Sequence, residues 1–348
     1  MILDALGRHR WWITRTLALP VHIAGFATVT FFLVRLVPGD PVLSALDSSQ
    51  GITPEQYHRA AVAMGLDGSI WRQLGRFWAG LVHLDLGTSS VTGRPIWVEI
   101  WSRLPETVEL VFFGLGGAVL FSMVLGAVLL QVRTGPAYWA LRGYARMAGA
   151  VPDFALAILG LVLLYSALRV VPAPIGRVDP GMEIPVVTGF PILDCLLTGE
   201  WSVLASMVGH LLLPVAVMIL VYTPIIWKQF ALGLDDSVAS PATLFRIASG
   251  ATRAAIYLSI VRRAGASAVV MVGSMFGALV GGVIVLQQLF SLGGLSQFAI
   301  DSVNTVDFLG LQGFLVVLAA VSMIAFFAVD IVNMLLDPRR RPGVNAEG

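Results

Sequence analysis

Six long apolar stretches decide what this chain can fold into. Each holds about 20 residues or more with few charges, which is the length that an α-helix needs to cross the hydrocarbon core of a bilayer. Backbone inside a bilayer must pair its own polar groups, so these stretches predict six transmembrane helices. They cover residues 12–36, 107–132, 144–171, 202–227, 265–290 and 312–336.

Composition agrees with a membrane protein. Hydrophobic residues make up 57% of the 348 residues and charged residues only 12%, against about 25% charged in an average soluble domain. A chain this apolar lacks the polar groups to cover its surface in water. The sequence therefore predicts an all-α membrane protein. Its first apolar stretch is too long for a cleaved signal peptide, so we expect a retained first helix.

The positions of Lys and Arg indicate the orientation, because cytoplasmic loops carry an excess of both. The third connection has only Arg177 and, at its edge, Arg169, and the fifth has none. The basic residues gather instead in both tails and in the second and fourth connections: Arg8, Arg10, Arg15, Arg133, Arg142, Arg146, Lys228, Arg246, Arg253, Arg262, Arg263, Arg339, Arg340 and Arg341. We expect both termini in the cytoplasm.

The first connection, residues 37–106, is much the longest and is expected outside the cytoplasm. Thr53 followed by Pro54 predicts a capped helix that runs to residue 64 and stops at Gly65. Residues 70–81 predict a second, amphipathic helix with aromatic residues suited to the headgroup level. We favour a helix that covers the bundle over one that contacts substrate. The expected divisions are residues 1–36, the tail and first span; 37–105, the outer loop; 106–337, a five-span core; and 338–348, a cytoplasmic tail.

Several function classes are disfavoured by the residues that the chain holds. The net charge of +1 does not predict a nucleic-acid surface. One cysteine, Cys195, excludes an internal disulfide framework. The five histidines are scattered and form no H-E-x-x-H pair, so we expect no metal site, and no catalytic group stands out. The chain also lacks a G-x-x-x-x-G-K-[ST] loop, so it is not expected to bind ATP phosphates itself.

A series of short motifs runs through almost the whole chain. In this order and spacing, the set resembles the first permease subunit of the dipeptide, oligopeptide and nickel ATP-binding cassette (ABC) importers. The motifs are LVPGDP at 36–41, TPE at 53–55, GLD at 65–67, LDLGTS at 84–89, TGRP at 92–95, RLPETVEL at 103–110, HLLLP at 210–214, VD at 329–330 and LDPR at 336–339.

The resemblance implies a fold, a location and a set of partners. It implies the six-helix type I ABC importer permease fold in a bacterial cytoplasmic (inner) membrane. Such importers pair two homologous permeases with two ATP-binding subunits, which hold ATP and Mg, and with an extracytoplasmic substrate-binding protein. Short peptides are the favoured substrate. Nickel, glutathione or another small solute stays open as an alternative, and so does an ion-gradient transporter, although no repeated halves with broken helices are evident.

The resemblance also implies a short cytoplasmic helix, between the fourth and fifth spans, that docks in an ATP-binding subunit. We expect it at residues 241–251, because Ser240 and Pro241 form a cap and first-turn pair. Thr243, Leu244 and Phe245 replace the usual Val-Arg-Thr of the family, Ala231 replaces an arginine and Ala268 a proline. The expected coupling residues are Asp236, Pro241, Leu244, Phe245, Ile247, Ala248 and Gly250.

Polar and small residues in the spans suggest a pathway. Asp153 stands where the family more often has serine; it would attract a substrate's amino terminus, or simply sit on a helix dipole. His210 is expected to form a helix-to-helix hydrogen bond rather than a proton relay. Asp330 is expected to pair within the bundle. Glu106 and Glu109 are expected to suit the dipole at the outer start of the second span. The pathway candidates are Asp153, His210, Ser274, Gly277, Gln287 and Gln288, although close packing explains the small residues of the fifth span equally well.

Overall fold

The computed structural model describes residues 2–46, 51–132 and 134–336. Regular structure in these ranges is helical, apart from one isolated bridge that pairs Thr88 with Pro95. The expectation of an all-α protein is confirmed. The C-terminal residues expected as a cytoplasmic tail, together with Arg133, lie outside the described residues.

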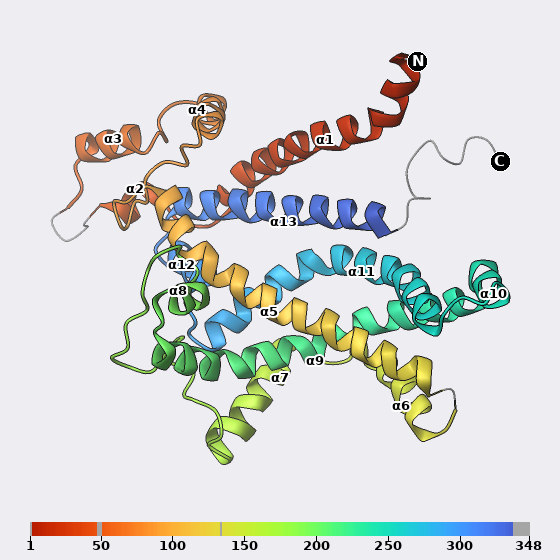
Figure 1. The fold of residues 1–348 in the computed structure, drawn as a ribbon. Helices are drawn as coiled ribbons and strands as arrows, with labels where there is room; N and C mark the ends of the chain where they lie inside the picture. Colours follow the sequence, from red (N-terminus) through yellow and green to blue (C-terminus); the bar gives the residue numbers. More distant parts are fainter. Residues whose placement is uncertain (1, 47–50, 133, 337–348) are drawn as a thin grey trace.

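Five long helices run alongside one another and form an elongated bundle (Figure 1). Each is long and apolar enough to cross a membrane. The last two long helices are connected through a bent pair of helical segments, Leu279–Leu289 and Gly294–Asn304. The two segments meet at 82° and would make a sixth span if counted as one. The five long helices are α1 (Ile2–Val34), α5 (Ile96–Gln131), α9 (Trp201–Ala239), α11 (Arg253–Leu289) and α13 (Phe308–Leu336).

The predicted third span is wrong in its bounds. Residues 144–171 are divided among the end of α6 (Pro136–Tyr144), a tight turn η2 (Ala145–Met147), and a shorter apolar helix, α7 (Asp153–Gly160) with its wider continuation η3 (Leu161–Ala167). Gly149 takes a left-handed backbone with φ +73°, and Pro152 has no amide hydrogen to donate into a helix. The segment is therefore apolar throughout, but its helix is interrupted between Met147 and Asp153.

The shorter helices gather at the two ends of the bundle (Figure 1). At one end lie α2 (Pro41–Ala45), α3 (Pro54–Ala63), α4 (Ile70–Val82), α8 (Pro191–Thr198) and α12 (Gly294–Asn304), and at the other α6 and α10 (Pro241–Ala248). The predicted start of α3 is confirmed, since Thr53 and Gln56 form a reciprocal capping box. Gly65, just after α3, has φ +69°. The amphipathic helix predicted from residue 70 is also confirmed.

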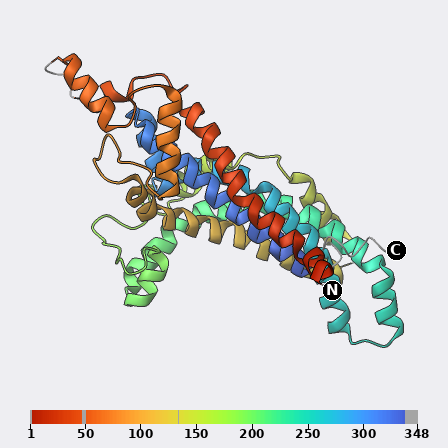
Figure 2. The ribbon, with the colours of Figure 1, turned by 90° about the horizontal axis from the view of Figure 1, so that it is seen from above.

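The core of the bundle lies where α5 and α9 pack closely. A Cβ at Gly114 would come within 2.5 Å of Met218 Sδ, and one at Gly126 within 2.5 Å of Phe230. Small residues on α5 therefore let large side chains of α9 approach its backbone, as is common between membrane helices. By contrast, α1 lies along α13 at the side of the bundle (Figure 2). Much of its apolar surface is exposed.

Candidate functional site

The short helix α10 begins where the sequence predicts it. The Ser240 backbone is extended, and its Oγ accepts a hydrogen bond from the Thr243 amide at 3.3 Å. Pro241 occupies the first turn, where its missing amide hydrogen is not needed. Beyond the helix, Gly250 has φ +74°, a conformation that favours glycine, and the chain turns into α11.

One face of α10 is fixed to its neighbours by polar contacts. Thr243 is buried, and its Oγ1 donates to the Ser237 carbonyl of α9 at 2.7 Å. Arg263 of α11 donates to the same carbonyl at 3.2 Å and also to Thr243 Oγ1. Sequence reasoning missed both roles, because it treated Thr243 only as a departure from the family pattern.

The helix α10 also presents apolar side chains to the outside. Leu244, Phe245 and Ile247 are 59%, 73% and 56% exposed. Asp236 and Ala248 are also exposed, at the end of α9 and of α10. The structure therefore brings most of the expected coupling residues together on one protruding helix. Large exposed apolar patches of this kind mark surfaces that meet another molecule.

The neighbouring helix α6 is held against α9 at the same end of the bundle. Arg142 forms an ion pair with Asp235 at 2.6 Å, and this carboxylate raises the pKa of the Arg142 guanidinium. The buried Trp227 donates its indole hydrogen to the Leu141 carbonyl at 2.8 Å. The α6 helix and the base of α10 therefore belong to one framework, built on α9.

Asp153 lies where α7, α9 and α11 meet. It is the first residue of α7, and its Oδ1 accepts a hydrogen bond from the Phe154 amide at 2.8 Å. Its Oδ2 accepts one from the Tyr222 hydroxyl of α9 at 3.2 Å. A Cβ at Gly282 of α11 would overlap this carboxylate. Both interpretations of Asp153 thus have support: it lies in the first turn of its own helix, and it contacts α9 through Tyr222.

His210 does not make the expected helix-to-helix hydrogen bond. Its Nδ1 pairs with the Ser206 carbonyl of its own helix at 2.9 Å. Its Nε2 lies 3.9 Å from Asp179 Oδ1, in the connection after α7. The ring is almost fully buried. The nearest partner therefore comes from a loop, which the spacing of the spans does not reveal.

The remaining pathway candidates are spread along α11. Gln287 is fully buried, and its amide donates to Thr107 Oγ1 of α5 at 3.0 Å. Gln288 and Ser274 are exposed, and Ser274 bonds the Met271 carbonyl of its own helix. Gly277 lies in α11, and the structure does not describe what surrounds it. The structure does not bring the other five candidates into one site.

Glu106 and Glu109 do not start the second span, because α5 begins at Ile96 and both carboxylates lie well inside it. The expected dipole role is therefore wrong. Glu109 instead forms a buried ion pair with Arg177 at 2.9 Å and accepts from the Ile192 amide at 2.8 Å. Arg177 also donates to the Glu106 carbonyl at 2.9 Å. The pair fastens the connection before α8 onto α5.

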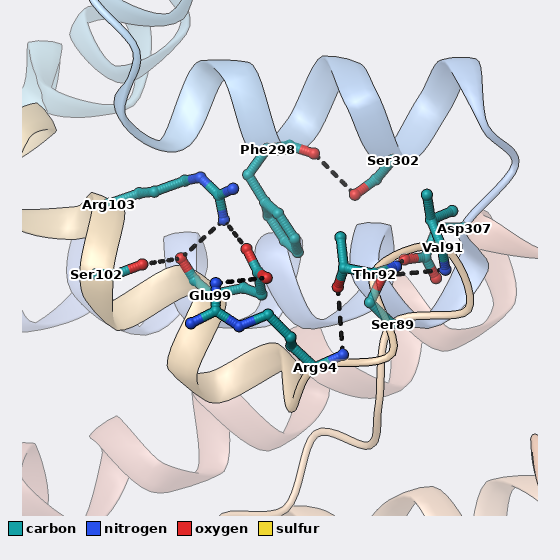
Figure 3. Close-up of polar contacts among 10 residues, drawn as sticks. All are labelled: Ser89, Val91, Thr92, Arg94, Glu99, Ser102, Arg103, Phe298, Ser302 and Asp307. Atoms are coloured by element: carbon teal, nitrogen blue, oxygen red, sulfur yellow. Dashed lines mark hydrogen bonds and ion pairs between the residues drawn. The ribbon is translucent and has the colours of Figure 1, made fainter.

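A second polar cluster explains several of the sequence motifs in the outer loop (Figure 3). Ser89 Oγ donates to the buried Asp307 at 2.5 Å, and Asp307 also accepts from the Gly310 amide at 3.0 Å. Glu99 pairs with Arg103 and lies 3.5 Å from Arg94. The Ser89 contact ties the loop before α5 to the turn between α12 and α13. Within the described ranges, no group of three or more side chains suited to a metal ion occurs.

The chain is similar to known transport proteins over most of its length. The family described as "Binding-protein-dependent transport system inner membrane component" matches residues 118–342. The probable D,D-dipeptide transport system permease protein of Escherichia coli is 30% identical, over 95% of this chain and 96% of that protein. The dipeptide transport system permease protein of the same organism is 27% identical, over 93% and 96%. The di/tripeptide transport system permease protein of Pseudomonas aeruginosa is 26% identical, over 91% and 94%.

Proposed function

Because the chain belongs to the family of binding-protein-dependent transport system inner membrane components, we propose that it forms half of the translocation pathway of an ATP-driven importer for short peptides. A second homologous permease supplies the other half. Two ATP-binding subunits bind ATP and Mg, and an extracytoplasmic binding protein delivers the substrate. The names of the similar permeases support peptides as the substrate class. This chain contributes no catalytic group of its own.

The observation that carries this proposal is the two-sided attachment of α10. Its polar face is bonded to α9 and α11 through Thr243 and Arg263. Its apolar side chains Leu244, Phe245 and Ile247 are exposed and open to a partner. A helix fixed on one side and docked on the other passes a displacement of the ATP-binding subunit directly to two spanning helices. We therefore assign the coupling role to Asp236, Pro241, Leu244, Phe245, Ile247, Ala248 and Gly250.

The arrangement of the ends supports a topology with both termini in the cytoplasm. The beginning of α1 and the end of α13 lie at the same end of the bundle as α6 and α10 (Figure 1). The basic residues Arg142, Arg246 and Arg253 also lie there, as expected for cytoplasmic loops. The helices α2, α3 and α4 then face outward, which supports an outer loop between the first span and the remaining spans.

Within the pathway, we propose that Asp153 attracts the amino terminus of the substrate. Its partial exposure and its position between α7, α9 and α11 support this role. Ser274 and Gln288, which are exposed, and Gly277 remain pathway candidates. The side chains of His210 and Gln287 are buried and hydrogen-bonded, so we assign them a structural role in the bundle.

Gentle affinity purification of the chain from its native membranes tests the assembly. We expect a second permease, ATP-binding subunits and a secreted binding protein to co-purify, and the binding protein to bind peptides rather than nickel. A chain that purifies alone would contradict the ATP-driven mechanism and would favour ion-gradient transport. A binding protein that takes only nickel would keep the importer and change its substrate.

Coupling is tested in the same complex with Gly250→Pro. Proline cannot adopt the φ of +74° found here, so the turn after α10 must reorganise. We expect ATP hydrolysis to continue while peptide uptake falls. Unchanged uptake would contradict the role of this segment.

A further inference from the structure

Arg35 directly follows an apolar span, at the level where we expect a bilayer to change from hydrocarbon to headgroups. The apolar span within α1 covers Thr16–Val34, and Arg35 is the next residue. The neighbouring amphipathic helix α4 carries aromatic residues that suit the same level. This placement depends on the end of the span and not on which side of the membrane it faces.

The hydrogen bonds of Arg35 leave its charge unneutralised. Nη1 donates to the Phe31 carbonyl at 2.8 Å and to Gln312 Oε1 at 3.3 Å, and Nη2 donates to Gln73 Oε1 at 3.0 Å. The guanidinium also lies 3.4 Å from the centre of the Phe31 ring. All these partners are neutral. Among the described residues, Nε has no hydrogen-bond partner, and no carboxylate lies within ion-pair distance of Arg35.

Two hollows meet at Arg35. One, of about 540 Å³, lies between α1, α4, the loop at residues 85–90 and the start of α13. The other, also about 540 Å³, lies between α2, α3 and the loop at residues 66–68. Arg35 and Gln73 line both. Volumes of this size fall within the range of ordinary ligand sites, about 300–1,000 Å³.

The other charged groups that line the hollows already have partners. Arg76 forms an ion pair with Asp67 and holds the pKa of that carboxyl below its usual value. Asp40 caps α2 with one oxygen and accepts from the Tyr57 hydroxyl with the other. Asp85 accepts from the Gly87 amide at 2.8 Å. Of the two arginines that line the hollows, Arg76 is therefore paired with a carboxylate and Arg35 is not, while Asp40 and Asp85 are hydrogen-bonded by neutral donors.

The surface beside the hollows is apolar. Leu36 is 78% exposed and Trp71 is 70% exposed. The Trp71 ring contacts the Phe32 ring, with centroids 6.2 Å apart. An anion that enters here thus finds apolar side chains next to its charged contact. That combination matches an amphiphile better than a free ion.

We propose that Arg35 binds the phosphate of a phospholipid headgroup, whose acyl chains lie along Leu36 and Trp71. A guanidinium offers a fork of N–H donors that matches the oxygens of a phosphate, and the free Nε provides one of them. A transported solute is disfavoured, because α1 packs on α13 and lies outside the junction of α7, α9 and α11. The lipid site goes beyond the proposed transport function, and its test needs no transport.

The test counts phospholipids retained by the full complex after purification in mild detergent, by native mass spectrometry. We expect retention in the wild type and a loss of about tenfold or more in Arg35→Gln, since a charged hydrogen bond is removed. Arg35→Lys keeps the charge without the fork and is expected to retain an intermediate amount. The matched control is Arg59→Gln on the exposed side of α3, where the arginine donates to the Glu55 carbonyl and lines neither hollow.

Equal retention in Arg35→Gln and wild type would overturn the proposal, as would an equal loss in Arg59→Gln. Inorganic phosphate separates a lipid from a free ion: we expect millimolar phosphate to leave the retained lipid in place. Full displacement by phosphate would overturn the lipid assignment. Thermal unfolding of each variant is recorded in the same detergent. If Arg35→Gln unfolds, folded Arg35→Lys decides the question, and wild-type retention in that variant would count against the proposal.

Discussion

Gly282 shows how one small residue shapes the junction of α7, α9 and α11. An added Cβ would overlap the Asp153 carboxylate and come within 2.8 Å of the Tyr222 hydroxyl. At the adjacent Gly281, an added Cβ meets nothing within 4 Å. The two neighbouring glycines therefore differ in the space around them. Only at Gly282 does the missing side chain leave room for the Asp153 carboxylate.

Gly282→Ala is expected to disturb this junction. Overpacking of this kind destabilises a protein by about 1–3 kcal/mol, so the melting temperature of the purified complex should fall, together with peptide uptake. Gly281→Ala is the matched control, and it should be neutral or slightly stabilising, because alanine forms helix better than glycine. Equal melting temperatures for the two variants would contradict the described packing.

The buried pair between Glu109 and Arg177 gives a second residue-scale prediction. Removing one partner of such a pair leaves an uncompensated charge and costs about 3–5 kcal/mol. Arg177→Met should therefore lower the unfolding temperature and expose the connection before α8 to proteases. Glu109→Leu added to Arg177→Met should recover much of the loss, since both charges are then gone. A double variant no more stable than Arg177→Met would argue against a direct pair.

Residue-scale predictions from the sequence succeed where the signal is local. The caps at Thr53 and Ser240, and the turn at Gly250, depend on neighbours within a few positions. Glu109 was misinterpreted because its partner Arg177 lies far along the chain, and the start of α5 was placed too late. A long-range pair of this kind has no signature in one sequence.

At the scale of elements, α10 combines a predictable helix with an unpredictable attachment. Its cap and its apolar side chains follow from residues 240–250. Its hydrogen bond with Arg263 depends on how α11 packs against α9 and α10. The bounds predicted for the third span are wrong for a related reason. Hydropathy carries through residues 144–171, whereas Gly149 and Pro152 divide the backbone.

Thr243→Val tests how firmly α10 is attached. The variant keeps the shape of the side chain but removes the donor to Ser237 and the acceptor for Arg263. An unsatisfied buried group costs about 1–3 kcal/mol, so amides of residues 241–248 should exchange faster with solvent. Uptake per ATP hydrolysed should also fall. Ser249→Ala, at the exposed end of the same helix, is the control, and a similar change there would refute the anchoring role.

At the scale of the whole molecule, the proposed topology is testable because the only cysteine, Cys195, is buried. Val187→Cys, in the connection before α8, should react with a membrane-impermeant maleimide on intact spheroplasts, since Val187 is highly exposed. Phe245→Cys should react only after lysis. Reaction of both cysteines from the same side would contradict the orientation.

The family and the all-α architecture follow from the sequence because motifs and apolar length extend through the whole chain. The position of α1 beside α13 and the outer polar cluster at Asp307 do not, because both depend on contacts between distant segments. Of the candidate sites, the short helix α10 lies where the sequence predicts it, and its coupling role stays a prediction. The pathway residues were scattered, since hydropathy marks a span without showing which side faces the centre.

The most direct test of the account is whether Phe245 touches an ATP-binding subunit in the native membrane. Phe245→Cys, reacted with a short thiol-to-amine crosslinker, should form one product with an ATP-binding subunit, and peptide uptake should stop when the link forms. Val187→Cys, at the opposite end of the bundle, should not form it. An active complex in which Phe245→Cys never links to an ATP-binding subunit would contradict the claim that α10 transmits the energy of ATP.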